Sequence, residues 1–155
     1  RSGSVTGVQT CALPIYLLLI FLCLPLHLLA QKKDTLRLTC LLNNATEHQE
    51  KQAVNVGPKE LKLILSSTTD TLVKACADAV ISTIQRDEEG KWDIVFNQKD
   101  YWFWLTGVSK VTVKKDQRVK AGDTIGIIQP GEKIELLLYD FETPLDPKKY
   151  MNCGK

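Results

Sequence analysis

The chain has 155 residues, of which 44% are hydrophobic and 25% are charged, and its formal net charge at pH 7 is +2. A length of this order suits one compact domain, which buries roughly two-thirds of the surface of its unfolded chain. The near balance of basic and acidic side chains excludes the strongly basic face with which nucleic-acid-binding proteins neutralise phosphates. We therefore expect one domain and no nucleic-acid partner.

The first thirty residues differ from the rest of the chain. Residues 1–16 lack an initiator methionine and a basic n-region, which indicates either sequencing-adapter read-through or a truncated start. Residues 17–30 form an uncharged apolar run, too short to span a bilayer, that ends in Ala30 before a polar stretch, as in a secretory signal peptide. We expect cleavage after Ala30 and export to the periplasm or the extracellular space, with membrane contact only through an uncleaved signal segment.

Three cysteines follow the signal segment: Cys40, Cys76 and Cys153. An odd number of cysteines cannot pair off completely within one chain. Cys40 and Cys76 lie in apolar runs, where a cysteine is most often a small buried hydrophobe, whereas Cys153 lies in the tail, residues 152–155. The sequence leaves a disulfide among these three open.

Short apolar or alternating runs, bounded by polar and glycine-containing turns, recur along the rest of the chain. Alternation such as Leu36-Arg37-Leu38-Thr39 places successive side chains on opposite faces of a strand. The spacing of the runs predicts an all-β fold, a two-layer antiparallel sandwich. The predicted strands are residues 35–42, 61–66, 72–85, 92–97, 101–108, 111–114, 124–129 and 134–139.

The segments between these runs carry weaker signals. Residues 87–90 and 97–100 are predicted turns, and residues 45–53 fit a polar loop or a short helix equally well. Pro144 and Pro147 lack the N–H group that a central strand needs, so we expect an extended lead-out there.

The residues from Tyr101 onward, YWFWLTGVSKVTVKKDQRVKAGDTIGII, resemble the LytM/lysostaphin-type zinc peptidases. In that family a strand ends in a histidine followed by leucine-serine-lysine, and two glycine-containing turns come next; Gly122 and Gly126 match these turns and suit positive φ. Asp116 stands at another turn glycine of the family and tolerates a left-handed backbone. Two further blocks, residues 71–81 and 133–151, match in the same order.

The resemblance implies a duplicated-hybrid-motif sandwich over residues 60–151, with residues 31–59 as a lead-in strand and loop. It also places the family's zinc site. The positions that match the family's histidine and aspartate ligands and its other site histidines hold Glu60, Ile64, Gly107, Lys133 and Glu135.

A catalytic zinc ion needs about three protein ligands, usually including histidine. The chain has two histidines, His27 in the signal segment and His48, which we expect to be a solvated surface residue. The resemblance therefore implies a degenerate member with no metal, no cofactor and no peptidase activity.

Two further arrangements of side chains are candidates for binding or catalysis. By alternation Tyr101, Phe103 and Leu105 share the face that lines the substrate groove in the family, and with Lys133 and Glu135 they form a candidate ligand groove. The alternative is that both faces of this aromatic strand are buried in a sandwich core. Glu135 and Asp140 are predicted to lie on opposite faces of one strand, which argues against a carboxylate pair for glycoside hydrolysis.

These observations favour a binding protein of the bacterial envelope. The predicted partner is peptidoglycan or a cell-wall amidase of the kind that degenerate members of this family activate. The alternatives are a lipoyl- or biotinyl-like carrier or adaptor domain, or a structural subunit of an envelope assembly.

Overall fold

A computed structural model describes Gly3 and residues 36–49, 61–151 and 153. Residues 36–155 form a compact unit of their own. The expected signal segment, Glu60 and all of residues 1–16 except Gly3 lie outside the described residues. No helix among the residues described is long and apolar enough to cross a membrane.

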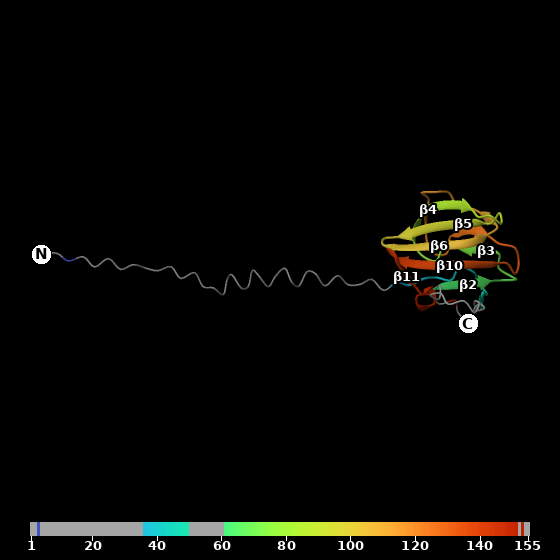
Figure 1. Cartoon of the computed structure of the whole chain (residues 1–155), viewed down its shortest axis with the longest axis horizontal. Coiled ribbons are helices and arrows are strands. Elements are labelled where there is room, and N and C mark those ends of the chain that lie inside the picture. Colours follow the sequence, from blue (N-terminus) through green and yellow to red (C-terminus); the bar gives the residue numbers. More distant parts are fainter. Residues whose placement is uncertain (1–2, 4–35, 50–60, 152, 154–155) are drawn as a thin grey trace. The chain divides into compact units, whose positions relative to one another are not determined.

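The described residues form two antiparallel sheets, as predicted for an all-β sandwich. The larger, eight-stranded sheet has the order β1-β2-β10-β6-β5-β4-β8, with β11 pairing with β10, and the smaller has the order β3-β9-β7. Figure 1 shows β4, β5, β6, β10 and β2 stacked in this order. The strands are β1 (Thr46–His48), β2 (Lys62–Ser66), β3 (Leu72–Lys74), β4 (Ala79–Arg86), β5 (Trp92–Gln98), β6 (Tyr101–Val108), β7 (Lys110–Val111), β8 (Arg118–Val119), β9 (Thr124–Ile127), β10 (Lys133–Asp140) and β11 (Thr143–Leu145).

One face of each central strand of the larger sheet packs into a shared core, and we call this the inner face. Ile134, Leu136 and Leu138 of β10 alternate along the strand and are fully buried. Phe103 and Leu105 of β6 are buried beside them, and the smaller sheet contributes further apolar side chains to the same cluster. Alternating burial of this kind is what the period-2 sequence pattern predicts.

Glycines allow the two layers to come close together. A Cβ atom on Gly126 in β9 would lie 2.5 Å from Cγ1 of Val108, so Gly126 is required for space rather than for the positive φ predicted from the sequence. Gly122 and Asp116 do have positive φ, 92° and 65°, as predicted. The turn at residues 87–90 is also confirmed, because Gly90 has φ 82° and donates its N–H to the carbonyl of Asp87.

Several predicted boundaries are wrong. The run at residues 72–85 is two strands, β3 and β4, which belong to different sheets. Within residues 36–42 the only β-pairing is a single bridge from Leu38 to Met151. Residues 45–53, predicted to be a polar loop or a short helix, contain a short edge strand, β1, in their described part.

The C-terminal segment also differs from the prediction. Pro144 lies in β11, an edge strand that pairs with the end of β10, rather than in an unpaired lead-out. Pro147 opens a short 3-10 helix, η2 (Pro147–Lys149), capped by the Asp146 side chain. Both placements respect the missing N–H of proline, which an edge strand and the first turn of a helix tolerate.

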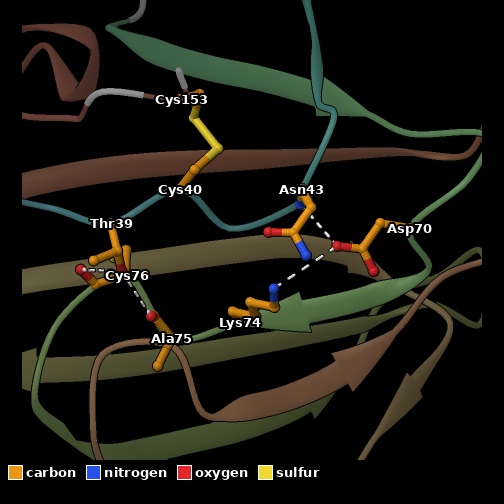
Figure 2. The surroundings of a disulfide bond; sticks show 8 residues. All are labelled: Thr39, Cys40, Asn43, Asp70, Lys74, Ala75, Cys76 and Cys153. Atoms are coloured by element: carbon orange, nitrogen blue, oxygen red, sulfur yellow. Dashed lines mark hydrogen bonds and ion pairs between the residues drawn. A yellow bond between two sulfur atoms is a disulfide. The ribbon is translucent and has the colours of Figure 1, made fainter. Parts of the chain in front are cut away.

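The lead-in residues belong to the same core as the sandwich, and a disulfide holds them there. Leu38, Leu41 and Leu42 are buried, and Cys40 bonds to Cys153 across 113 residues of sequence (Figure 2). The Thr39 hydroxyl lies within hydrogen-bonding distance of the backbone carbonyls of Ala75 and Cys76, and the Thr39 N–H donates to the Cys76 carbonyl. Cys76 is a buried free thiol, as expected, and its burial raises its pKa; Cys40 is instead a disulfide partner.

Candidate functional site

The described positions of the predicted degenerate site come together on the outer face of the larger sheet. Ile64 of β2 lies directly opposite Glu135 of β10, and Glu135 lies directly opposite Thr106 of β6. Directly opposed residues of paired strands point to the same face. Ile64, Glu135 and Thr106 therefore form one row across three strands, on the side away from the buried Leu136.

Gly107 and Lys133 lie at one end of this row. Lys133 precedes Glu135 by two residues and so shares its face, opposite Ser66 of β2. Gly107 has φ 84°, and a Cβ atom there would lie 2.6 Å from the carbonyl oxygen of Lys133. The backbones of β6 and β10 are thus too close at this point for any side chain at position 107.

These side chains do not fit a zinc ion. Ile64 and Gly107 offer no donor atom, and the protonated Lys133 has no lone pair to donate. Glu135 is already engaged, because its carboxylate forms an ion pair of 3.0 Å with Lys62. Within the part of the chain that the structure describes, no group of three His, Cys, Asp or Glu residues could hold a metal ion.

His48 lies closer to this row than the sequence indicated. It sits on β1 directly opposite Ile64, is half-buried, and its Nε2 is hydrogen-bonded to Oγ of Ser66 at 2.7 Å. The expectation of a solvated surface histidine is therefore wrong. The polar segment around His48 has no clear alternation, so nothing in the sequence revealed its pairing with β2.

The aromatic strand β6 presents the opposite face to the one predicted for the groove. Phe103 and Leu105 are fully buried on the inner face, so they cannot line a groove with Lys133 and Glu135. Trp102 and Trp104 lie directly opposite Tyr139 and Leu137 of β10, which places the tryptophans on the outer face. Their side chains remain 40% and 41% exposed. Tyr101 is half-buried.

Asp140 follows the inner-face alternation of β10, five residues from Glu135 on the outer face. Their placement on opposite faces agrees with the prediction. Another carboxylate, Asp93 of β5, lies opposite Gln85, whose amide donates to one of its oxygens at 3.3 Å. The other oxygen is buried and has no hydrogen-bond partner among the described residues, which is uncommon for a buried polar atom.

Three polar side chains, Lys91, Ser109 and Glu132, form a hydrogen-bonded network at the end of the sheet near Gly107. Lys91 pairs with Glu132, and the Ser109 hydroxyl donates to the same carboxylate. Lys91 also donates to Ser109 at 3.1 Å, and the N–H of Gln129 donates to Glu132 at 2.8 Å. The bonds from Lys91 and then Ser109 lower the pKa of Glu132 to about 2. The sequence did not reveal this network, because its members lie up to 41 residues apart and most of them belong to turns.

A cavity of about 310 Å³ lies elsewhere, at the inner face of β2. Its described lining includes Leu63, Leu65, Met151 and Cys153, with Glu47 and Lys148 among the polar residues. It is separate from the row that contains Ile64 and Glu135, whose side chains point to the other face of the sheet.

The comparison with family models identifies the fold. The model of peptidase family M23 matches residues 63–143, which is more than half of the chain. The chain belongs to peptidase family M23. The match covers β2 to the start of β11 and therefore includes Ile64, Gly107, Lys133 and Glu135.

Several solved structures share this fold at low identity. A point mutant of the catalytic domain of EnpA, a prophage-encoded M23 protein from Enterococcus faecalis, is 16% identical, with a TM-score of 0.56 over 69% of this chain and 92% of that one. Csd3 from Helicobacter pylori is 14% identical, with a TM-score of 0.63 over 77% of this chain and 34% of Csd3. A chain of the SpoIIQ–SpoIIIAH pore-forming complex is 11% identical, with a TM-score of 0.58 over 78% and 94%. No curated protein matches the chain.

Proposed function

We propose that this M23 protein is catalytically inactive, is exported, and acts in the cell envelope by binding cell-wall material or a partner hydrolase. The observation that carries the proposal is the content of the row on the outer face. Where the resemblance to LytM-type peptidases implies zinc ligands and further site histidines, the described residues are Ile64, Gly107, Lys133 and Glu135, and Glu135 is paired with Lys62. Such a site lacks the donors that a metal-activated water requires.

The framework around this site supports a role for the fold itself. The inner-face side chains of β6 and β10 are buried in the core, and Gly126 leaves the space that Val108 of the other layer occupies. A chain that had lost all function would have no reason to retain both. Binding through the outer face accounts for a kept scaffold beside a site without metal ligands.

The structural relatives are compatible with a binding role. SpoIIQ occurs in a pore-forming complex with SpoIIIAH, so this fold can serve within an assembly. The carrier alternative gains no comparable support. Met151, the only methionine, is buried and pairs with Leu38, whereas a carrier lysine is flanked by such residues at an exposed hairpin tip.

Metal analysis of the purified protein tests the inactivity. We expect less than stoichiometric zinc after exposure to zinc and buffer exchange, and no release of fragments from purified cell walls. An active M23 peptidase assayed in parallel provides the positive control. One tightly bound zinc ion per chain together with cell-wall cleavage would refute the proposal.

A pull-down tests the binding surface. Wild-type protein and the Lys133→Ala/Glu135→Ala variant are compared for capture of purified cell walls and of envelope proteins. The matched control is Lys120→Ala/Glu88→Ala, which removes the same two charge types at exposed turns away from the row. We expect capture to fall only in the first variant; unchanged capture would exclude this end of the outer face as the binding surface.

A further inference from the structure

The outer face of the larger sheet carries an ordered set of side chains beyond the predicted site. On β6, Trp102 lies between Asn97 of β5 and Tyr139 of β10. Two residues further on, Trp104 lies between Val95 and Leu137. We call these six residues the outer platform: Val95, Asn97, Trp102, Trp104, Leu137 and Tyr139.

The two tryptophans are unusual for their position. β6 is a central strand, hydrogen-bonded to β5 and β10 on its two sides, so its outer side chains are not at a sheet edge. Each indole nevertheless leaves about two-fifths of its surface exposed. Large exposed apolar side chains gathered on one face usually mark a site of interaction.

The charges around the platform limit what it can bind. None of its six residues is an Asp, Glu, Lys, Arg or His, and at the end towards Thr106 the carboxylate of Glu135 is neutralised by Lys62 at 3.0 Å. A polyanion would find no cluster of cations on the platform, and a cationic peptide would find no carboxylate there. The polar side chains of Asn97 and Tyr139 at one end and of Thr106 and Glu135 at the other suit a ligand rich in neutral hydrogen-bonding groups.

We propose that the outer platform binds a linear polysaccharide of mainly uncharged hexose rings, stacked on Trp102 and Trp104. A pyranose ring has one apolar C–H face and a rim of hydroxyl and amide groups. The C–H face is attracted to the negative face of an indole ring, and the rim can bond to the polar side chains at the two ends. This inference rests on the proposed binding function and names the glycan, rather than the peptide, as the bound part of the wall.

The spacing of the two tryptophans along β6 permits contact with two neighbouring sugar rings. Residues two apart on one strand are separated by about 6.6–6.8 Å, so the two indoles can cover neighbouring rings of one linear molecule. A protein partner of ordinary affinity needs about 800 Å² per side and usually a pocket for its anchor residue. The cavity described above lies on the other face of β2, away from the platform.

Asp93 borders the platform at the Thr106 end. It lies two residues before Val95 on β5 and is only 8% exposed, with one oxygen that lacks a donor among the described residues. A ligand hydroxyl that reached this oxygen would supply the missing hydrogen bond. Because this oxygen is buried, the Asp93 side chain would have to turn outwards to accept that bond.

Binding of defined saccharides to the full chain tests the inference. The two probes are β-1,4-linked N-acetylglucosamine oligomers and β-1,4-linked glucose oligomers, whose rings are uncharged. Binding is followed by tryptophan fluorescence and calorimetry. Intact cell walls are used in parallel. We expect saturable binding with a change in tryptophan emission, and affinity reduced about tenfold by Trp104→Ala or Trp102→Ala, since a lost stacking contact of this kind is worth roughly 1.4 kcal/mol.

Two control variants test whether the loss of affinity is specific to the platform and whether it depends on an aromatic ring. Phe141→Ala removes an aromatic side chain that is 66% exposed in the turn after β10, outside the platform, and should leave affinity unchanged. Trp104→Phe keeps an aromatic plate and should recover most of the affinity lost in Trp104→Ala, even if the alanine variant is less stable.

The outcomes separate the inference from the proposed function. Wild-type protein that binds intact walls but neither saccharide probe would overturn the glycan platform while leaving wall binding in place. Equal saccharide affinity of the wild type, Trp102→Ala and Trp104→Ala would also overturn it. So would capture of an envelope protein that is lost in both alanine variants while no saccharide binds, because the platform would then recognise a protein.

Discussion

The two faces of strand β6 behave differently although they belong to the same eight residues. On the inner face Phe103 and Leu105 are fully buried, and Phe103 stacks on Phe96 with ring centroids 5.0 Å apart. On the outer face Trp102 and Trp104 are two-fifths exposed. The inner side chains are constrained by close packing, whereas the outer ones contribute less to the fold.

Strand β10 repeats the contrast. Ile134, Leu136 and Leu138 fill the core, while Lys133 and Glu135 alternate with them on the outer face. The side chains of the predicted site therefore lie on one face of β10, and those that pack the core lie on the other. The following predictions test how independent the two faces are.

The largest effect is expected from a cavity in the inner face. Phe103→Ala should lower the free energy of unfolding by about 3–5 kcal/mol, because it removes a buried ring and leaves a void. Trp102→Ala, the neighbouring outer-face change, should cost less than about 1.5 kcal/mol. Urea unfolding followed by circular dichroism measures both. Equal losses would show that the two faces are not distinct in energy.

Removal of the disulfide should have the next largest effect on the free energy of unfolding, because this bond holds the lead-in residues over the core. Cys40→Ser/Cys153→Ser should lower the free energy of unfolding by about 2–4 kcal/mol, since the bond joins residues 113 apart in the unfolded chain. Thermal unfolding with and without dithiothreitol gives the control: the reductant should destabilise the wild type and leave the serine variant unchanged. A wild type insensitive to reduction would contradict the bond.

Position 107 tests the close contact between β6 and β10. Gly107→Ala should destabilise by about 2–3 kcal/mol, because alanine disfavours φ 84° and its Cβ would meet the carbonyl oxygen of Lys133. Gly90→Ala is the matched control, with φ 82° but open space around it, and should cost about 1 kcal/mol. Gly107→His should likewise destabilise and fail to recruit zinc. Similar costs at both glycines would remove the steric argument.

The smallest effect concerns the network at the end of the sheet. Glu132 has a pKa lowered to about 2 from an ordinary value of 4.5, so its contribution to stability is complete above pH 4.5 and is lost as the pH falls towards 2. Its side chain is 30% exposed, which limits the contribution to less than about 1 kcal/mol.

Acid unfolding of Glu132→Gln measures this contribution. The variant should show a shallower loss of stability between pH 4.5 and 2 than the wild type. Glu88→Gln, in the exposed turn after β4, is the control because it removes one carboxylate without touching the network. An unchanged acid profile in Glu132→Gln would show that the three side chains do not act together.

Much of the framework was predictable from local patterns. Alternating residues and flanking turns located β5, β6, β9 and β10 to within about two residues, and the glycine-containing turns pointed to Gly90 and Gly122. These features depend on neighbours in sequence, which is why a period of two and a positive φ can be read without coordinates. The resemblance to LytM-type peptidases also predicted the family, which the M23 match confirms.

Other features depended on contacts between distant residues. Nothing near Cys40 or Cys153 shows that they meet, and the short β1 that carries His48 has no periodicity of its own. The run at residues 72–85 looked continuous, yet the chain bends between β3 and β4 and enters a second sheet.

The sequence by itself determined that the strands are amphipathic, where most of them turn, and that the chain has too few histidines for the family's zinc site. Only the tertiary structure decided which face of β6 is buried, because alternation separates two faces without saying which one meets the second sheet. The tertiary structure thus places Trp102 and Trp104 on the same outer face as Glu135, and Phe103 and Leu105 in the core.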